Sequence, residues 1–307
     1  MREKLLEICD RWDIELTEQV PLASHTTFHI GGAADYWAEI SSEQGLAQLV
    51  QFCRETGMPY FVMGRGSNIL AADEGFRGII LHIGSRFSNM EWKTPHTLKC
   101  EAGAMLIRAA KSAEEHGQTG MEGLSGIPGS IGGALFMNAG AYGYEMSQIV
   151  SSCTYLDPKG EIHMRKASQL DLGHRHSWFM DHPDCIILTV TMQLEAGDPA
   201  EITAQMQDFL QRRSDKQPLD LPSAGSTFKR PAGSYASKLI DECGLKGLTV
   251  GGAQVSEKHA GFVVNTGDAT AADVLALCRE VRDRVKKETG YLLEMEPVLL
   301  GDIELGA

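Results

Sequence analysis

Two glycine-rich segments of the 307-residue chain have the composition of phosphate-binding loops. The first is VMGRGSNIL (62–70), in which Gly64 and Gly66 are followed by Ser67 and Asn68. Glycines permit the positive φ angles that turn successive backbone N–H groups inward to bind an anion, and the two polar side chains add donors. A tight turn between two strands is the alternative. Because no GK[ST] or GxGxxG pattern is present, the segment indicates neither a P-loop NTPase nor a Rossmann dinucleotide fold.

The second segment is GLSGIPGSIGGALFMNAGAYG (123–143), which contains seven glycines and one proline. Its glycines leave long stretches of backbone amide uncovered by side chains, so a pyrophosphate and a flat ring could lie against it. The alternative is a packing crossover, in which glycines only let two elements touch. Seven glycines interleaved with isoleucines are hard to explain by packing alone, so the segment favours ligand binding.

The composition excludes several kinds of partner. Hydrophobic residues make up 43% of the chain, and the formal net charge is −13. A nucleic-acid binder generally needs a basic surface to release counterions, so a nucleic-acid partner is not expected. No apolar run approaches the roughly 20 residues that span a membrane, and the opening MREKLLEICDRW is typical of an amphipathic helix. We therefore expect a cytoplasmic small-molecule protein with no membrane contact and no obligate protein partner.

The cysteines and histidines do not form a metal-binding pattern. The seven cysteines are odd in number, and no two of them stand in a CxxC arrangement. Among the ten histidines, the only tight cluster is HRHSWF at 174–179. We expect free thiols in a reducing compartment and no metal site.

Helical and extended patterns alternate along the chain, which predicts a mixed α and β fold of two or three domains. Helices are expected at 41–57, 105–117, 200–218 and 271–290, and strands at 60–63, 78–83, 97–103 and in a hairpin at 154–164. In the last helix, Val274, Cys278, Val281 and Val285 fall on one buried stripe. The proline-punctuated QPLDLPSAGSTFKRPAG (217–233) indicates the entrance to a further domain.

Five ordered motifs give the chain a family resemblance. HTTFHIGGAAD (25–35), VMGRGSNIL, the segment 123–143, PSAGSTFKRP (222–231) and LEMEPVLLG (293–301) together resemble the UDP-N-acetylenolpyruvoylglucosamine reductase (MurB) family along almost the whole chain. The resemblance implies an NADPH-dependent flavoprotein oxidoreductase of peptidoglycan precursor synthesis, with non-covalent FAD and a UDP-sugar substrate. It also implies an α+β fold, with FAD-binding domains of the vanillyl-alcohol-oxidase (PCMH) type and a C-terminal α/β substrate-binding domain.

The resemblance implies a division of the chain and a set of cofactor residues. FAD-binding subdomain 1 would be 1–62 with 297–307, FAD-binding subdomain 2 would be 63–215, and the substrate-binding domain would be 216–296. The two glycine-rich segments would hold FAD between them. The implied cofactor-binding residues are Gly64, Arg65, Gly66, Ser67, Asn68, Ile69, Gly123, Gly126, Ile127, Pro128, Gly129, Ser130, Gly132 and Gly133.

Three catalytic residues are implied by the family motifs. Ser226, in AGSTFKRP, corresponds to the proton donor, and Glu296, in LEMEP, corresponds to the catalytic glutamate. Arg175, in HRHS, corresponds to the arginine that binds the substrate carboxylate, although His174 replaces the usual tyrosine. On residue type alone, Ser226 would be a turn former and Arg175 a partner in a surface ion pair.

These residue types suit the implied reaction. A flavin hydride, supplied by NADPH, would add to the methylene carbon of the enolpyruvyl ether, and negative charge would develop beside the carboxylate. A guanidinium and a carboxyl group aimed at developing charge can each contribute ~3 to 4 kcal/mol. A serine has a high pKa, so Ser226 needs a polar partner to deliver the proton, and Lys229 or Lys216 is the candidate.

Four residues are implied to bind the substrate: Tyr142, Lys216, Arg230 and His259. Two cations suit a diphosphate. Their ordinary alternatives are a packing aromatic, a solvated helix-end charge and a turn histidine. The short stretch between Ser177 and Asp198 indicates the short type of the family, without the tyrosine-bearing insertion.

Two other functions remain open from the sequence. The same FAD fold supports alcohol and sugar oxidases, often with flavin attached to a histidine, for which His25 and His29 are candidates, although AGSTFK and LEMEP do not belong to them. The second alternative is a catalytically idle nucleotide-sugar sensor. The presence of Arg175, Ser226 and Glu296 together favours the reductase.

Overall fold

The computed structural model describes residues 1–306, which fold into two compact units. Unit 1 contains Met1–Glu18, Tyr36–Arg65 and Gly78–Arg212. Unit 2 contains Gln19–Asp35, Gly66–Arg77 and the chain from Arg213 onward. The boundaries fall inside strands β1 (Glu15–Pro21), β2 (Ala33–Glu39) and β5 (Phe76–His82), which belong to a sheet of order β1-β2-β5-β3. The three-domain division implied by the family stays a prediction.

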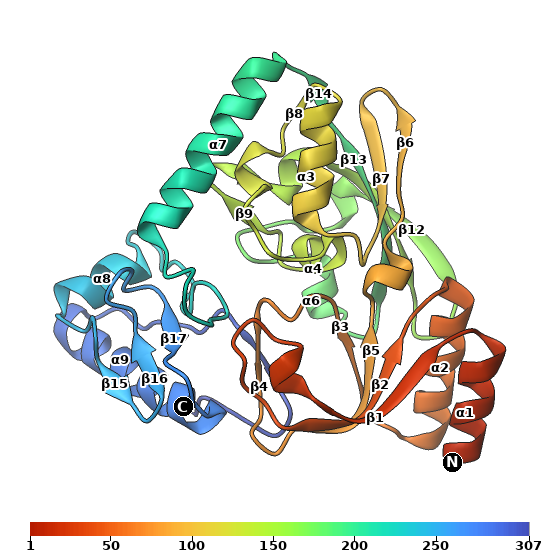
Figure 1. The fold of residues 1–307 in the computed structure, drawn as a ribbon, viewed down its shortest axis with the longest axis horizontal. Coiled ribbons are helices and arrows are strands. Elements are labelled where there is room, and N and C mark those ends of the chain that lie inside the picture. The colour runs from red at the N-terminus through yellow and green to blue at the C-terminus, as the bar shows by residue number, and fades with distance from the viewer. Residues whose placement is uncertain (307) are drawn as a thin grey trace. The chain divides into compact units, whose positions relative to one another are not determined.

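Apart from strands β1, β2, β4 and β5, unit 1 contains every α-helix and strand from α1 to α7 (Figure 1). They are α1 (Arg2–Arg11), α2 (Glu43–Thr56), β3 (Tyr60–Met63), β6 (Met90–Thr94), β7 (Thr97–Glu101), α3 (Leu106–Glu115), β8 (Gln118–Thr119), α4 (Ile131–Phe136), β9 (Gly140–Ala141), β10 (Tyr144–Glu145), α5 (Met146–Ile149), β11 (Val150–Leu156), β12 (Ile162–Lys166), α6 (Trp178–Asp181), β13 (Ile186–Gln193), β14 (Glu195–Ala196) and α7 (Pro199–Lys216, whose last turn enters unit 2).

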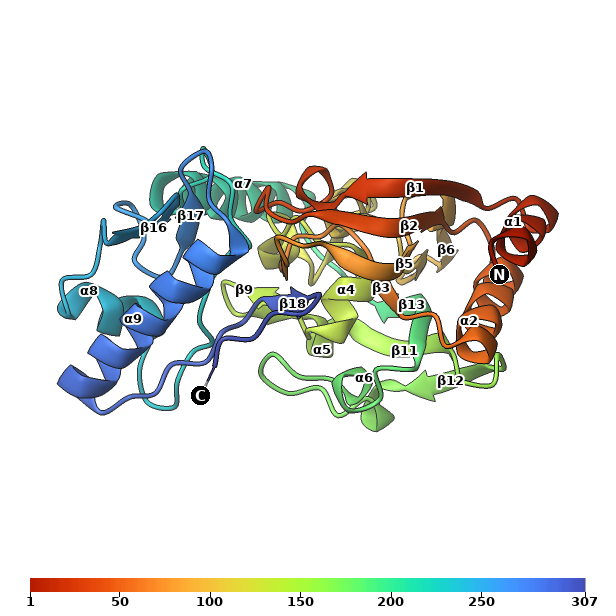
Figure 2. The same ribbon diagram turned by 90° about the horizontal axis from the view of Figure 1, so that it is seen from below.

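The main sheet of unit 1 is antiparallel and has the order β12-β11-β13-β7-β6. Its central strand β13 reads IILTVTMQ and is buried along nearly its whole length, so it forms the middle of the core. Helix α4 packs against β13 and β7. Helix α1 packs against α2, as Figure 2 also shows. The sheet therefore provides a rigid support for the glycine-rich segment that leads into α4.

Unit 2 combines three short strands with a long helix. Its elements are β4 (Ile69–Ala71), α8 (Ala236–Glu242), β15 (Thr249–Val250), β16 (Ala253–Val255), β17 (Val263–Asn265), α9 (Ala271–Thr289) and β18 (Val298–Leu300). Strands β15, β16 and β17 form an antiparallel sheet, against which α9 packs. Strand β18 pairs in parallel with β4, so the end of the chain joins the strand that follows the first glycine-rich segment.

The expected helices and strands are present, with ends shifted by a few residues. Helix α9 begins with a capping box between Thr270 and Asp273 and ends at Gly290, whose φ of +79° is the left-handed conformation that favours glycine. Its predicted stripe is fully buried in the core of unit 2. The predicted hairpin is formed by β11 and β12. The mixed α and β fold class is confirmed.

All seven cysteines are free thiols, as expected. Among residues 1–306, no helix combines the length and the apolar character that crossing a bilayer requires.

Candidate active site

Ser226 and Glu296 lie on two segments that pair with each other in unit 2. Phe228 and Met295 form an antiparallel bridge. The Lys229 N–H donates to the Glu294 carbonyl (2.8 Å), and the Glu296 N–H donates to the carbonyl of residue 227 (2.9 Å). This register places Glu296 directly across from Thr227, the residue that follows Ser226, although the two segments are far apart in sequence. Ser226 is exposed and Glu296 is half-buried, so the serine hydroxyl is open to a ligand.

Thr227 fixes the serine segment on its other side. Its side chain is 2% exposed, and its Oγ1 accepts a hydrogen bond from the Val263 N–H (2.8 Å). Its own N–H donates to the Gly261 carbonyl (2.8 Å). The segment of Ser226 is therefore held between the strand of Glu296 and the turn that leads into β17.

That turn contains His259, the expected substrate ligand. The Gly261 N–H donates to His259 Nδ1 (3.1 Å), so the ring proton is assigned to Nε2. Burial is the main cause that lowers the pKa of His259, and the charges of Lys246 and Lys216 lower it further. A backbone hydrogen bond to the ring and the charge of Asp241 raise it, but the pKa remains below its usual value. His259 is therefore a neutral Nε2–H donor that lies within electrostatic reach of Lys216. The charge of one expected substrate residue therefore influences the protonation of another.

The depressed pKa of His259 predicts a pH dependence of stability. The folded protein holds the ring neutral while the unfolded chain protonates it, so this contribution is complete above the usual histidine value of 6.5 and declines as the pH falls toward the lower folded value. His259→Asn keeps an acceptor for the Gly261 N–H and removes the titration. We expect the unfolding free energy, measured by urea titration from pH 7.5 to 5, to fall less steeply in the variant. If the unfolding free energy of the variant and of the wild type fell equally steeply with pH, the depressed pKa of His259 would not contribute to stability.

Lys229 and Arg230 of unit 2 each contact a nearby side chain. Lys229 Nζ lies 3.5 Å from a carboxylate oxygen of Glu294, and the Arg230 guanidinium lies 4.0 Å above the Tyr235 ring. Assistance to Ser226 by Lys229 or Lys216 stays a prediction.

In unit 1, Arg175 occupies a tight turn. Gly173 and His176 exchange both backbone hydrogen bonds (3.1 and 3.2 Å), and Arg175 between them has a φ of +53°. An arginine in the left-handed region is uncommon, because the Cβ atom crowds the backbone there. One Arg175 guanidinium nitrogen donates to the Gly140 carbonyl (3.3 Å).

This hydrogen bond places Arg175 near Tyr142, another expected substrate residue. Tyr142 follows Gly140 by two residues, also has a positive φ (+55°), and its ring stacks on Phe209 at 4.7 Å between centroids. The tyrosine is 39% exposed, so one face of its ring remains available to a ligand.

The first glycine-rich segment connects β3 to β4, with 62–65 in unit 1 and 66–70 in unit 2. Gly66 has a φ of +62°. In unit 2, the Asn68 side chain donates to the Glu296 carbonyl (3.3 Å), and the Val298 N–H donates to the Asn68 carbonyl (2.9 Å). The expected phosphate-binding loop is therefore tied directly to the expected catalytic glutamate.

Two protein-family models match this chain. Residues 34–164 match the FAD binding domain family, and residues 217–300 match the C-terminal domain of UDP-N-acetylenolpyruvoylglucosamine reductase. The chain is 43% identical over 298 residues to the UDP-N-acetylenolpyruvoylglucosamine reductase of Agathobacter rectalis, with 94% of each chain covered. The Streptococcus pneumoniae enzyme is 42% identical over 302 residues, covering 98% of this chain and 99% of its own. The chain belongs to the UDP-N-acetylenolpyruvoylglucosamine reductase family.

A solved member of this reductase family has the same fold. The crystal structure of the Thermus caldophilus enzyme superposes with a TM-score of 0.79 at 34% identity, covering 94% of this chain and 98% of that chain. The predicted fold class, FAD-binding domains of the PCMH type with a C-terminal reductase domain, is confirmed. FAD is therefore the cofactor of the chain, and NADPH is its hydride donor, as in the family.

In unit 1, the residues expected to hold FAD leave main-chain atoms partly exposed, which suits a cofactor bound against the backbone. A Cβ atom on Gly64 would stand 2.4 Å from Ser130 Oγ, so the first glycine-rich segment touches the second where the latter enters α4. Beside this contact, Pro128 and Gly133 are exposed, and Gly126, Ile127 and Gly129 are half-buried.

Other glycines of the second segment serve packing. A Cβ atom on Gly123 would meet the Ala141 carbonyl oxygen at 2.4 Å, and one on Gly132 would meet the Ala102 Cβ at 2.8 Å. At these two positions the packing alternative explains the glycine, whereas 126–129 and Gly133 are at least partly exposed, as binding of FAD there would require.

The contact between the two glycine-rich segments predicts a specific destabilisation. Gly64→Ala would force a methyl group against Ser130, and overpacking of this kind costs ~1 to 3 kcal/mol. Ser130→Ala removes the Oγ atom and leaves the nearest side-chain atom at 3.3 Å, although it also removes the N-cap of α4. We expect Gly64→Ala to lower the melting temperature and the FAD content, and the double variant to recover both in part. A double variant worse than the sum of the single variants would contradict the contact.

Sequence reasoning assigned no supporting role to three buried residues of the site: Thr227, Asn138 and Ser177. All three are buried and bond to backbone groups near expected catalytic residues. Asn138 carried one usable signal, because asparagine tolerates the left-handed conformation that it adopts here (φ +42°).

Proposed function

We propose that Ser226, Glu296 and Arg175 carry out the substrate half of an FAD-dependent reduction of UDP-N-acetylglucosamine enolpyruvate to UDP-N-acetylmuramate, with NADPH as donor. The NADPH-dependent reductase activity follows from the family membership of the chain. The observation that supports the residue assignment is the pairing of the segments that contain Ser226 and Glu296. An exposed hydroxyl and a carboxyl group on adjoining segments suit a step that places a proton on a carbon beside developing charge.

Each residue has a separate task in this proposal. FAD, when bound, supplies the hydride for the methylene carbon of the enolpyruvyl ether. Arg175 binds the substrate carboxylate, and its guanidinium stabilises the negative charge that spreads onto that group. Its turn limits the orientations open to the side chain.

Glu296 and Ser226 complete the addition. Glu296, held at its N–H by residue 227 and at its carbonyl by Asn68, stabilises the enolic form of the carboxylate. Ser226 donates its hydroxyl proton to the carbon that bears the carboxylate. The carbanion is a strong base, so a serine of ordinary high pKa can protonate it.

Four further residues bind the UDP moiety in this proposal. Lys216 and the Nε2–H of His259 contact the diphosphate, with Arg230 as a second cation, and Tyr142 packs against the sugar or base through its exposed face. The electrostatic effect of Lys216 on His259 and the partly exposed ring of Tyr142 support this assignment. We also place the protein in the cytoplasm, since its cysteines are free.

Purified protein tests the proposal directly. We expect a yellow protein that releases one FAD on acid treatment and that oxidises NADPH only when UDP-N-acetylglucosamine enolpyruvate is present. Flavin that stays attached to the denatured chain, or NADPH oxidation that ignores the enolpyruvyl substrate, would contradict it.

A further inference from the structure

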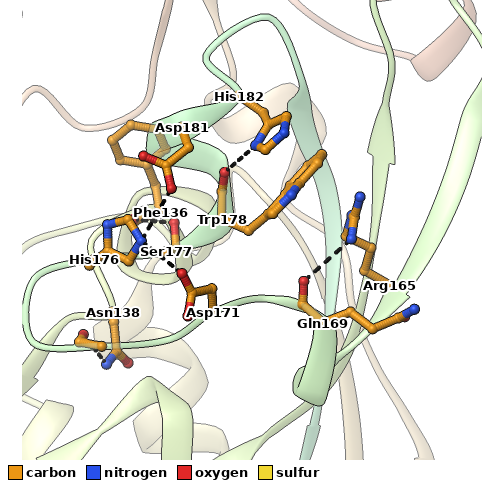
Figure 3. Close-up of polar contacts among 11 residues, drawn as sticks. Phe136, Asn138, Arg165, Gln169, Asp171, His176, Ser177, Trp178, Asp181 and His182 are labelled. Atoms are coloured by element: carbon orange, nitrogen blue, oxygen red, sulfur yellow. Dashed lines mark hydrogen bonds and ion pairs between the residues drawn. The ribbon is translucent and has the colours of Figure 1, made fainter.

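Asn138, the second residue after α4, forms a hydrogen bond to Gly173 at the start of the turn that contains Arg175. The Asn138 side chain is 1% exposed. Its Nδ2 donates to the Gly173 carbonyl (2.7 Å), and its Oδ1 accepts from the Ser147 N–H (2.9 Å), as Figure 3 shows in part. Nδ2 also lies 3.4 Å from a Glu145 carboxylate oxygen. The partners of Nδ2 only accept and the partner of Oδ1 only donates, so the two ends of the amide are both required. An aspartate could keep the second bond but not the first.

Ser177 forms a second hydrogen bond, to α4 itself, at the end of the same turn. The serine is fully buried, and its Oγ donates to the carbonyl of Phe136, the last residue of α4, at 2.6 Å. Between these two hydrogen bonds, His176 Nε2 lies 3.3 Å from Asp171 and 3.4 Å from Asp181 (Figure 3). Both ends of the turn are thus attached to the end of one short helix.

The two hydrogen bonds to the end of α4 explain how the turn keeps Arg175 in an unfavourable backbone conformation. Arg175 is held in the left-handed region, and a non-glycine residue remains there only when its surroundings impose that conformation. The helix that imposes it, α4, follows directly from the glycine-rich segment expected to hold FAD. The position of the guanidinium is therefore coupled to the position of the cofactor segment within unit 1.

We propose that Asn138 and Ser177 are positioning residues for Arg175: they fix its turn to the end of α4 and so set the guanidinium on the substrate carboxylate. The proposal rests on the proposed function of Arg175. Neither residue needs to touch the substrate or FAD. Their removal leaves Arg175 present but free to adopt other conformations, and misplacement by about 1 Å can cost roughly 10²-fold in rate.

A double-mutant cycle with the holoenzyme tests the proposal. Stopped-flow absorbance measures two rates, reduction of the flavin by NADPH and its reoxidation by UDP-N-acetylglucosamine enolpyruvate. We expect Ser177→Ala and Asn138→Asp each to slow reoxidation by about 10- to 100-fold, with reduction within about twofold of wild type. In an Arg175→Gly background, the same two changes should alter reoxidation by less than about twofold, because the residue they position is gone.

A buried hydroxyl elsewhere in unit 1 provides the matched control. Thr189 is 4% exposed, and its hydroxyl bonds to that of Thr154 (2.7 Å). Thr189→Val should lower the melting temperature about as much as Ser177→Ala and leave both half-reactions unchanged. If Asn138→Asp does not fold, the Ser177→Ala cycle alone decides.

The outcomes separate two failures. The positioning role would be overturned if Ser177→Ala slowed reoxidation as much in the Arg175→Gly background as in wild type. It would also be overturned if Ser177→Ala slowed both half-reactions alike. If the flavin of the Arg175→Gly variant is reoxidised at the wild-type rate, the function proposed for Arg175 is wrong, and this proposal fails with it.

Discussion

Ser226→Ala is expected to leave reduction of the flavin by NADPH near its normal rate while slowing reoxidation by the enolpyruvyl substrate by about 10² to 10⁴-fold. The reason is that Ser226 acts only after the hydride has been transferred, when the carbanion awaits its proton. General acid catalysis is typically worth this factor, or about 3 to 5 kcal/mol of barrier. Anaerobic stopped-flow absorbance measures the two half-reactions separately.

A neighbouring serine supplies the control for this variant. Ser223 lies in the same loop, and its hydroxyl accepts a hydrogen bond from the Gly225 N–H (3.4 Å). Ser223→Ala should cost some stability and change neither half-reaction. A Ser226→Ala protein that reoxidises within about threefold of wild type would reduce Ser226 to a turn former.

Arg175→Gly has the second large effect, and it separates chemistry from backbone strain. We expect reoxidation by the enolpyruvyl substrate to slow by about 10² to 10³-fold, the usual loss when a donor to developing charge is removed. The protein should meanwhile remain as stable as wild type or become more stable, because glycine adopts the φ of +53° without strain. Melting curves and stopped-flow traces of the same preparation measure both properties.

Arg175→Ala is the matched variant for this prediction. It removes the same guanidinium but keeps a Cβ atom in the left-handed region, where an L-residue costs roughly 1 to 2 kcal/mol relative to the right-handed one. The two variants should therefore be equally slow, with the glycine variant the more stable. A glycine variant that is fast, or one much less stable than the alanine variant, would show that Arg175 serves the fold.

The local structure of the chain could be predicted because its patterns are local. The apolar stripe of α9 has the helical period, and Gly290 marks its end. The hairpin of β11 and β12 follows from the DPKG turn between two extended runs. In each case the residues that determine the element lie within it, so no partner from elsewhere in the chain had to be known.

The site could be predicted only in part. Ser226 and Glu296 were assigned by family motifs, but nothing near either residue indicates that their segments pair, because the pairing joins distant parts of the chain. The left-handed conformation of Arg175 was equally hidden, since arginine does not favour it and the turn is imposed by Asn138 and Ser177 from outside. Long-range backbone contacts of this kind leave no periodic signal in a sequence.

A single turnover in deuterium oxide tests the account most directly. The protein is reduced anaerobically with one equivalent of NADPH and then mixed with UDP-N-acetylglucosamine enolpyruvate in deuterium oxide. We expect the flavin absorbance to return as one equivalent of UDP-N-acetylmuramate forms, with deuterium at the carbon that bears the carboxylate, because the exchangeable hydroxyl of Ser226 supplies that position. Return of the absorbance without this product, or a product without deuterium at that carbon, would contradict the account.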